Sequence, residues 1–335
     1  MAANLTPQYL KAEKEYRAAQ TLEDKLAALK KMLSELPKHK GTEKIHAGLK
    51  TRLSELKVEM ETRRKTGRAG VTFRVPKEGA AQIVLLGYPN VGKSQIVARL
   101  TGAHVEVADY PFTTRQPAPG MMRYEDIQIQ LVDTPPLSAR GMEPGMLDLI
   151  RAADAAMLVL DLSTDGDDIR PDPLEQADST ITRLSEVKIH LVGRVPDERE
   201  DPFVVYLKTL LVGSKVDVEG AQGRLAALED LYRERYTLLG LSARDNIGLD
   251  GFGRRLFDFL ELIRIYTKEP GKKPDLAAPY VLHRGATVLD LAERIHKDFA
   301  ERMKFARIWG ANAYSGQSVG RDHALNDKDV LELHI

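Results

Sequence analysis

The chain has 335 residues, of which 43% are hydrophobic, so it is long enough for two or three domains with buried cores. Lys plus Arg and Asp plus Glu each total 49, and a balanced charge indicates neither a nucleic-acid binder nor an acidic tail by itself. The absence of cysteine excludes disulfides, Fe–S clusters and thiolate zinc sites, and it fits a reducing compartment.

The first 64 residues are highly charged, and their beginning has no apolar core of the kind that signal peptides carry. No window of the chain approaches 18 apolar residues, so we expect a cytoplasmic protein that does not enter a membrane. Apolar residues recur at helical spacing in two groups, separated by a turn signal at 37–41. The first group is Leu22, Leu26, Leu29, Leu33 and Leu36, and the second is Ile45, Leu49, Leu53, Leu56 and Met60. The spacing predicts two antiparallel helices that bury their own seam; a docking arm for a protein partner is the alternative.

A basic segment at 63–70 follows, and we interpret it as the linker that ends an N-terminal region of residues 1–70. Beyond it, strand-like apolar runs alternate with helix-like segments. The runs are 82–86, 127–133, 155–161, 207–214 and 236–242, and the helix-like segments are 95–100, 174–184 and 222–234. This alternation predicts an α/β domain over residues 71–265, with a mostly parallel sheet covered on both faces. The polar stretch 187–203 is expected to be an insertion or loop on that sheet.

The composition changes again after Tyr266, where the polar and turn-rich sequence TKEPGKKPD precedes a smaller unit. Val288, Leu291, Ile295 and Phe299 predict one face of a helix from about 287 to 301. Strand-like segments flank it, namely YVLHRG, KFARIWG and VLELHI. Residues 266–335 are therefore expected to form a separate α+β domain.

A phosphate-binding pattern stands between the run 82–86 and a helical segment, where the sequence GYPNVGKS fits GxxxxGK[ST]. Glycines allow backbone amides to turn inward around phosphate, and the following helix points its positive N-terminal end at the same anion. Lys93 can then reach the outer phosphates, and Ser94 can ligate Mg²⁺. The predicted nucleotide-binding residues here are Gly87, Tyr88, Pro89, Asn90, Val91, Gly92, Lys93, Ser94 and Gln95.

Mg²⁺ needs further oxygen ligands, and two other segments offer them. Asp133 ends the run 127–133, where sites of this kind carry an acidic anchor for the metal. Thr114, in the loop YPFTTRQPAPG, offers a hydroxyl group, and ordinary turn chemistry is the alternative there. Ser94, Thr114 and Asp133 therefore form the predicted metal-binding set.

Base selection is predicted at SKVD, residues 214–217, which again follows an apolar run. The Asp217 carboxylate can accept two hydrogen bonds from the edge of guanine, whereas adenine presents no such pair of donors. Lys215 can lay its aliphatic stem over the ring. Ser242 and Ala243, after the last run, offer a backbone amide to the guanine carbonyl. Each motif alone is weak evidence for a nucleotide site. Their order and spacing together, from Ser214 onward, favour a guanine nucleotide.

The five segments GYPNVGKS, FTT, DTPP, SKVD and SAR resemble the G motifs of the Obg-type GTPases, above all those of the developmentally regulated GTP-binding proteins (DRG). The C-terminal segments YVLHRGATVLDLAERIHKDF, KFARIWG and VGRDHALNDKDVLELHI are similar to a TGS domain, a ubiquitin-like β-grasp module that this branch carries. The resemblance covers nearly the whole chain. It implies a P-loop GTPase domain with a mostly parallel sheet, preceded by an α-helical hairpin and followed by a β-grasp α+β domain.

The resemblance also implies roles at individual positions. Lys93 and Ser94 would bind phosphate and Mg²⁺, Thr114 would bind Mg²⁺ in the first switch loop, and Asp133 would bind it through water. Asn90 matches an asparagine that resembles a K⁺ ligand in relatives whose hydrolysis K⁺ stimulates; a capping or turn role is the alternative. Lys93, Thr114 and Asn90 are thus the expected catalytic residues for hydrolysis of GTP to GDP and phosphate.

Two positions depart from the pattern of that family. Pro136 stands where the DxxG motif has glycine, and proline has no N–H with which to bind the γ-phosphate. We expect nucleotide binding to survive, but the second switch should respond to the third phosphate more weakly or through Gly141 or Gly145. Ser214 replaces an asparagine, so guanine affinity is expected to fall while Asp217 preserves the preference.

Hydrolysis is expected to be slow, because Leu137 stands where Ras-like enzymes keep a glutamine that orients water. The Obg relatives also lack that glutamine, so we expect a turnover on the order of the 10⁻⁴ s⁻¹ of unassisted Ras or modestly above it. Two alternatives are open. Pro136 favours a guanine-nucleotide-binding and RNA-interaction module without hydrolysis, and Ser214 prompts an Obg-like ATPase.

The C-terminal unit concentrates basic residues with aromatic residues among them. They are Lys268, Lys272, Lys273, Arg284, Arg294, Lys297, Arg302, Lys304 and Arg307, with Tyr280, Phe305 and Trp309. Basic groups bind phosphate backbones, and aromatic rings stack on unpaired bases. Acidic residues are interspersed and the aromatic residues could be core residues, so composition leaves the partner open. The TGS resemblance implies contact with RNA or the ribosome.

Overall fold

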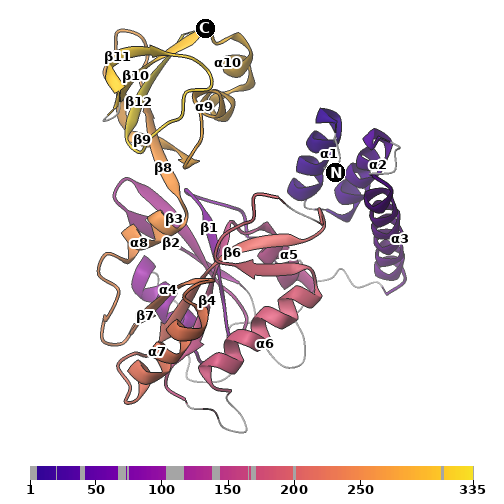
Figure 1. Cartoon of the computed structure of the whole chain (residues 1–335), viewed down its shortest axis with the longest axis vertical. Coiled ribbons are helices and arrows are strands. Elements are labelled where there is room, and N and C mark those ends of the chain that lie inside the picture. Colours follow the sequence, from indigo (N-terminus) through magenta and orange to yellow (C-terminus); the bar gives the residue numbers. More distant parts are fainter. Residues whose placement is uncertain are drawn as a thin grey trace. The chain divides into compact units, whose positions relative to one another are not determined.

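The structure is a computed structural model of the chain. It describes residues 6–19, 21–37, 42–66, 73, 75–102, 117–137, 144–164, 166, 171–198, 201–310 and 313–334. The chain divides into two compact units, Met1–Arg74 with Glu143–Ala152 and Val75–Met142 with Ala153–Ile335. Figure 1 labels most of the helices and strands of the two units.

The first unit is helical. It contains α1 (Pro7–Ala18), α2 (Leu22–Glu35), α3 (Glu43–Thr66) and α5 (Pro144–Ala152). The predicted pairing across 37–41 is present, because α2 contacts α3 and buries Leu29 and Met32. The predicted stripes correspond to α2 and α3, and α1 is an additional, separate helix that the apolar pattern did not predict. The hydroxyl of Thr21 accepts a hydrogen bond from the amide of Asp24, which starts α2 at Leu22.

The second unit contains a seven-stranded sheet. Its strands are β1 (Gln82–Leu86), β2 (Ala118–Tyr124), β3 (Ile127–Asp133), β4 (Ala155–Asp161), β5 (Ile189–Val192), β6 (Val205–Ser214) and β7 (Thr237–Leu241). The order is β2-β3-β1-β4-β6-β5, and β7 pairs with the last part of β6. All pairs are parallel except β2 with β3, which confirms the predicted α/β class.

Helices α4 (Lys93–Thr101) and α8 (Phe252–Phe259) bury side chains in one apolar cluster with alternating residues of the sheet. Helix α6 (Pro173–Glu186) contacts β4 and β5, and α7 (Ala221–Tyr232) contacts β7. The strands β1, β3 and β4 begin and end where their apolar runs do. Strands buried on both sides are nearly continuous apolar runs, so the bounds of β1 and β4 could be predicted from the sequence.

A second sheet lies at the C-terminal end of the chain. It contains β8 (Leu262–Thr267), β9 (Asp275–His283), β10 (Phe305–Gly310), β11 (Ala313–Val319) and β12 (Asp329–His334), in the order β11-β10-β12-β8-β9. Helix α9 (Val288–Ile295) covers one face, and its Val288 and Leu291 are buried with Ile263 and Ile308. This is the predicted α+β domain, although its first strand starts before residue 266.

Other elements also differ from the sequence predictions. The stretch 187–203 contains strand β5, so it is not only a loop. Strand β2 was not predicted and lies antiparallel to β3. The helix expected over 287–301 is two helices, α9 and α10 (Lys297–Arg302), because His296 has an extended backbone. Among the described helices, none is both long enough and apolar enough to cross a membrane.

Candidate functional site

The predicted site residues converge because parallel strands end at one edge of the first sheet. Gly87 follows β1, Asp133 ends β3, Asp161 ends β4, Ser214 ends β6 and Ser242 follows β7. Open α/β sheets bind their ligands outside the carboxyl ends of the strands. The structure therefore brings the phosphate, metal and base motifs to the same edge.

The shape of the loop between β1 and α4 depends on residues that tolerate unusual backbone angles. Gly87 has φ +147°, and a Cβ atom there would lie 2.5 Å from the carbonyl oxygen of Val159. Gly92 has φ +96° and begins α4 without a side-chain cap, so no side chain competes with an anion for the first amide groups. Asn90 has φ +61°, a conformation that asparagine adopts more readily than most residues. This conformation fits the turn alternative for Asn90.

Lys93 is the buried cation of this loop, and the residue is 6% exposed. Its Nζ donates hydrogen bonds to the carbonyls of Gly87, at 3.1 Å, and Tyr88, at 3.0 Å. Burial lowers the pKa of Lys93 to about 8, and the carboxylate of Asp133 opposes this shift. The ammonium group is therefore held inside the loop at the N-terminus of α4.

The other predicted loop residues fall into two groups. Val91 is buried in the core of the sheet, and the phenol of Tyr88 lies 2.9 Å from the hydroxyl of Ser179 on α6. Pro89 is partly exposed and Gln95 is exposed. Val91 and Tyr88 thus anchor the loop to the domain.

Two of the three predicted metal ligands lie in the part of the chain that the structure describes. Ser94 Oγ donates to Asp133 Oδ2 at 2.5 Å, and Asp133 is buried. Hydroxyl and carboxylate oxygens are ligands that Mg²⁺ prefers, so this pair fits the ion. Thr114 lies outside the described residues. The described part of the chain has no group of three or more acidic or histidine side chains for a metal, and Mg²⁺ commonly completes its shell with phosphates and water.

The segment after Asp133 is hydrogen-bonded to the loop after β1. The amide of Leu137 donates to the carbonyl of Gly87 at 3.1 Å, and the Leu137 side chain is buried. The hydroxyl of Thr134 donates to the carbonyl of Leu85. The amide that follows Pro136 is therefore engaged within the protein. Of the two residues expected to reroute the phosphate contact, Gly145 lies in α5 and residue 141 is outside the described residues.

Asp217 is a buried carboxylate in the predicted base site. A hydrogen bond from the Ser242 hydroxyl is the main cause of its lowered pKa, with Arg244 and Lys215 adding to the shift and burial opposing it. Arg244 Nη2 lies 2.5 Å from Asp217 Oδ2. The carboxylate is thus held ionised, which is the form that accepts two hydrogen bonds.

Ser214 and Lys215 are both held by neighbouring strand ends. Ser214 Oγ lies 2.6 Å from the carbonyl oxygen of Val91 and 3.0 Å from that of Leu160. Lys215 has φ +61°, and its Nζ donates to Asp161 Oδ2 at 2.6 Å. Serine therefore links the base-recognition segment to the phosphate loop without an amide side chain.

Sequence reasoning missed three residues that organise this site. Asp161 fixes Lys215 and accepts further hydrogen bonds from the amide and hydroxyl of Ser163, at 2.9 and 2.6 Å. Arg99 Nε donates to the carbonyl of Ala243 at 2.8 Å. Arg244 contacts Asp217. Asp161 carries the signal that identified Asp133, a carboxylate ending a buried apolar run, so the same rule could have found it.

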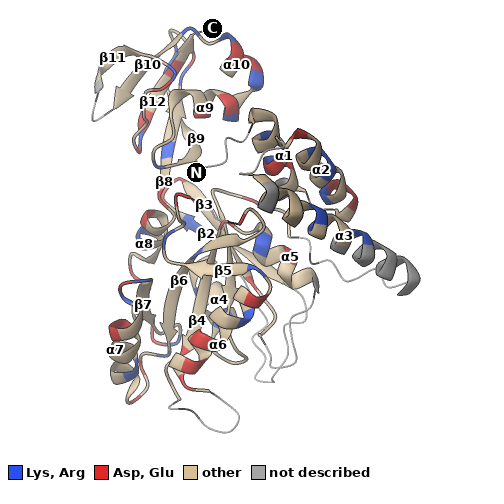
Figure 2. Cartoon of the chain, turned by 45° about the vertical axis from the view of Figure 1, so that its right-hand side comes forward, with Lys and Arg blue, Asp and Glu red and all other residues tan. Residues whose placement is uncertain are grey.

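The basic and aromatic residues of the C-terminal domain have different environments. Lys268 pairs with Glu332 at 2.9 Å and lies 4.2 Å from the ring centre of Trp309. Phe305 stacks on His334, with ring centres 4.5 Å apart. Tyr280 packs against the domain core. The exposed basic residues are Lys272, Lys273, Arg284, Arg294, Lys297, Arg302, Lys304 and Arg307, and acidic side chains are mixed with them on α9 and α10 (Figure 2).

Two family models match the chain. Residues 82–194 match the model described as 50S ribosome-binding GTPase, and residues 263–335 match the model of the TGS domain. The first covers most of the seven-stranded sheet, including the loop after β1 and Asp133. The second covers the C-terminal sheet.

Relatives match over nearly the whole length. An uncharacterized GTP-binding protein of Methanocaldococcus jannaschii is 30% identical, over 94% of this chain and 93% of the relative. The developmentally-regulated GTP-binding protein 2 of Homo sapiens is 29% identical, over 92% of this chain and 98% of the relative. The crystal structure of a GTP binding protein from Pyrococcus horikoshii matches with a TM-score of 0.52 and 18% identity, over 76% of this chain and 99% of that one. This last likeness concerns the fold.

Proposed function

Because the chain belongs to the DRG branch of the Obg family of GTP-binding proteins, we propose that it is a slow GTPase whose nucleotide state controls contact with RNA. The observation that carries the proposal is the meeting of three motifs at one sheet edge. Lys93 lies in the loop after β1, Ser94 contacts Asp133, and Asp217 is held ionised by Ser242.

The phosphates would be bound by the backbone of residues 87–94 and the N-terminus of α4. Lys93 would neutralise the outer phosphates, since its ammonium is already directed into the loop. Ser94 and Asp133, the latter through water, would hold Mg²⁺ together with Thr114, and the bound ion would supply charge neutralisation at the phosphates. Each of these groups favours a polyphosphate over a neutral ligand.

Guanine selectivity would come from Asp217. An ionised carboxylate accepts from the N1–H and amino group of guanine, and adenine offers no such pair. Lys215, fixed by Asp161, would cover the ring with its methylene chain, and Ser242 and Ala243 would face the guanine carbonyl. The ionised state of Asp217 therefore supports GTP over ATP.

Slow hydrolysis follows from the segment after Asp133. Leu137 is buried and has no group that orients water, while Pro136 has no amide for the γ-phosphate. The rate should be on the order of 10⁻⁴ s⁻¹ without a partner. K⁺ bound by the side-chain oxygen of Asn90 would increase it, and exchanging Na⁺ for K⁺ tests this role directly. Equal rates in the two salts would leave Asn90 with its turn role alone.

The RNA contact is assigned to the face of the C-terminal sheet opposite α9. Alternation along β10 directs Ala306 and Ile308 into the core, so Phe305, Arg307 and Trp309 lie on the other face. Aromatic rings beside an exposed arginine can stack on unpaired bases and bind phosphate. Arg307→Glu should weaken RNA binding and make that binding less dependent on salt. Arg294→Glu, on α9, is the matched control and should leave RNA binding unchanged.

Multiple-turnover phosphate release with and without ribosomes tests the GTPase assignment. We expect slow release that ribosomes accelerate. A nucleotide-bound protein with no release above background in either condition would instead be the non-hydrolysing alternative. Competition of ATP against labelled GDP tests the second alternative, and equal displacement by ATP would overturn the guanine assignment.

A further inference from the structure

Strand β8 connects two hydrophobic cores through its two faces. Ile263 and Ile265 are buried in the core of the TGS domain. Leu262 is buried in the core of the nucleotide domain, and Arg264 and Tyr266 reach the turn between β2 and β3. Because successive side chains of a strand point to opposite faces, this single strand contacts both domains.

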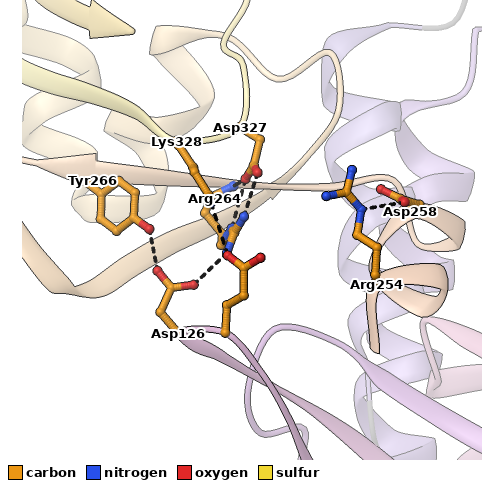
Figure 3. Close-up of polar contacts among 8 residues, drawn as sticks. Asp126, Arg254, Asp258, Arg264, Tyr266, Asp327 and Lys328 are labelled. Carbon is orange, nitrogen blue, oxygen red and sulfur yellow. Dashed lines mark hydrogen bonds and ion pairs between the residues drawn. The ribbon is translucent and has the colours of Figure 1, made fainter. Parts of the chain in front are cut away.

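Arg264 is the centre of this contact, with 2% of its side chain exposed. Its Nη1 donates to Glu125 at 2.6 Å and to Asp126 at 2.9 Å, both in the turn between β2 and β3 (Figure 3). Its Nε and Nη2 donate to the two carboxylate oxygens of Asp327 in the TGS domain, at 3.0 and 2.7 Å. One guanidinium thus binds carboxylates of both domains in a fixed fork geometry.

Neighbouring side chains strengthen the same contact. The phenol of Tyr266 donates to Asp126, and Lys328 Nζ lies 3.2 Å from the carboxylate of Glu125 (Figure 3). The guanidinium of Arg264 also lies over two rings of the nucleotide domain. These rings are Tyr124 and Phe257, whose centres are 5.7 and 5.0 Å from it. The turn is therefore bound from several directions.

Strand β3 joins this contact to the candidate metal site. It begins at Ile127, directly after the turn, and ends at Asp133, whose carboxylate is 2.5 Å from Ser94. Strand β2 pairs with β3 in register along its whole length. Closely packed elements move as units, so a shift at the Asp133 end of this hairpin displaces the turn at its other end.

We propose that the β2–β3 hairpin and Arg264 transmit the nucleotide state to the position of the TGS domain. This inference rests on the proposed GTPase function and adds the route by which it is regulated. A change between GTP and GDP alters the hairpin near Asp133. The Glu125–Asp126 turn then carries the TGS domain with it through Arg264.

Pulsed spin-label distance measurements test the proposal, because the chain has no cysteine and labels can be placed at will. Exposed positions on α7 and α9 are suitable, as Glu229→Cys and Glu293→Cys. We expect a narrow distance distribution that shifts between GDP and a non-hydrolysable GTP analogue. In the double variant Glu125→Gln with Asp126→Asn, the distribution should become at least twofold wider and independent of the nucleotide.

Two further variants keep the result interpretable. Arg264→Lys keeps the charge and loses the fork, so it should also widen the distribution, whereas replacement by alanine could prevent folding. Arg194→Ala is the matched control, since among the ion pairs of the described residues Arg194 pairs only with the exposed Asp197 of the nucleotide domain, and it should leave the distribution unchanged. Unchanged width in both the double variant and Arg264→Lys would overturn the contact.

Calorimetry on the labelled protein separates this inference from the proposed function. If the protein binds both nucleotides but the distance does not shift between them, transmission is refuted. If no nucleotide binds, the proposed function fails and the regulatory route fails with it. The widths measured without nucleotide then still report whether Arg264 holds the two domains together.

Discussion

The hydroxyl of Ser214 lies 2.6 Å from the carbonyl oxygen of Val91, which joins two segments separated by 123 residues. Val91 is in the loop after β1, and Ser214 opens the base-recognition segment. From the sequence we expected Ser214 to weaken guanine binding, because serine lacks the side-chain amide of asparagine. The structure shows that the short hydroxyl makes a buried connection between the phosphate and base segments.

Removing this hydroxyl should weaken GDP binding. Ser214→Ala loses a buried hydrogen bond and leaves the carbonyl of Val91 with one partner fewer, which costs about 1 to 2 kcal/mol of stability where the two segments meet. Because binding must then also order this junction, GDP affinity should fall by at most about thirty-fold. Titration calorimetry with GDP and Mg²⁺ measures the loss. Ser185→Ala, at the exposed end of α6, is the control. GDP affinity that stays the same in Ser214→Ala would show that the connection does not support the site.

Restoring an amide at position 136 should increase discrimination between GTP and GDP. A hydrogen bond to a charged group contributes about 1.5 to 3 kcal/mol, so Pro136→Gly should raise the affinity ratio about ten- to one-hundred-fold. Pro135→Ala adds an amide one residue earlier and should leave the ratio unchanged. Equal ratios for Pro136→Gly and the parent protein would contradict the account of the missing amide.

Nucleotide affinity should fall at alkaline pH because of Lys93. Its pKa in the free protein is about 8, and phosphate oxygens favour the ammonium form, so binding raises that pKa and takes up a proton. Affinity for GDP should be constant below pH 8 and fall above it, being about tenfold weaker at pH 9 than at pH 7. Calorimetry at pH 8.5 in two buffers of different ionisation enthalpy measures the uptake. Binding without uptake would place Lys93 away from the phosphates.

Acid should loosen the contact between the two domains through Glu125. Hydrogen bonds from Arg264 and then Lys328 lower the pKa of Glu125 from 4.5 to about 2. A lowered folded-state pKa stabilises the protein fully above pH 4.5, and this contribution is lost as the pH falls toward 2. The parent protein should therefore lose more thermal stability between pH 5 and pH 3 than Glu125→Gln does. Glu293→Gln on α9 should behave like the parent, and a Glu125→Gln variant with the parent's acid sensitivity would exclude this pair as the cause.

The sequence predicted those parts of the fold in which local pattern and tertiary position agree. Buried parallel strands such as β1 and β4 are almost continuous apolar runs, and both ended at the predicted residue. Strand β2 has the sequence APGMMRY, and its proline and glycine are typical of turns, so the sequence did not predict a strand there. The strand is present because it pairs with β3. The break at His296 was hidden because the apolar spacing from Val288 to Phe299 continues through it.

The site was predictable where the residues that carry its chemistry are adjacent in the sequence. The loop with Lys93 and Ser94 is such a motif, and so is the segment with Asp217. Asp161 and Arg264 lie in no motif, and their roles come from neighbours that are 54 and about 140 residues away. The order of the first sheet, with β4 beside β6, creates the contact of Asp161. The contact of Arg264 arises where β8 of the second sheet meets the turn between β2 and β3 of the first, and periodicity reveals neither relationship.

Titration of nucleotide-stripped protein with GDP in the presence of Mg²⁺ tests the central assignment most directly. If the amides of residues 87–94 and the carboxylate of Asp217 form a guanine-nucleotide site, GDP should bind with measurable heat, ATP should bind far more weakly, and Lys93→Ala should abolish the GDP signal. Folded protein that gives no heat with GDP or GTP, or that binds ATP as tightly as GDP, would contradict it.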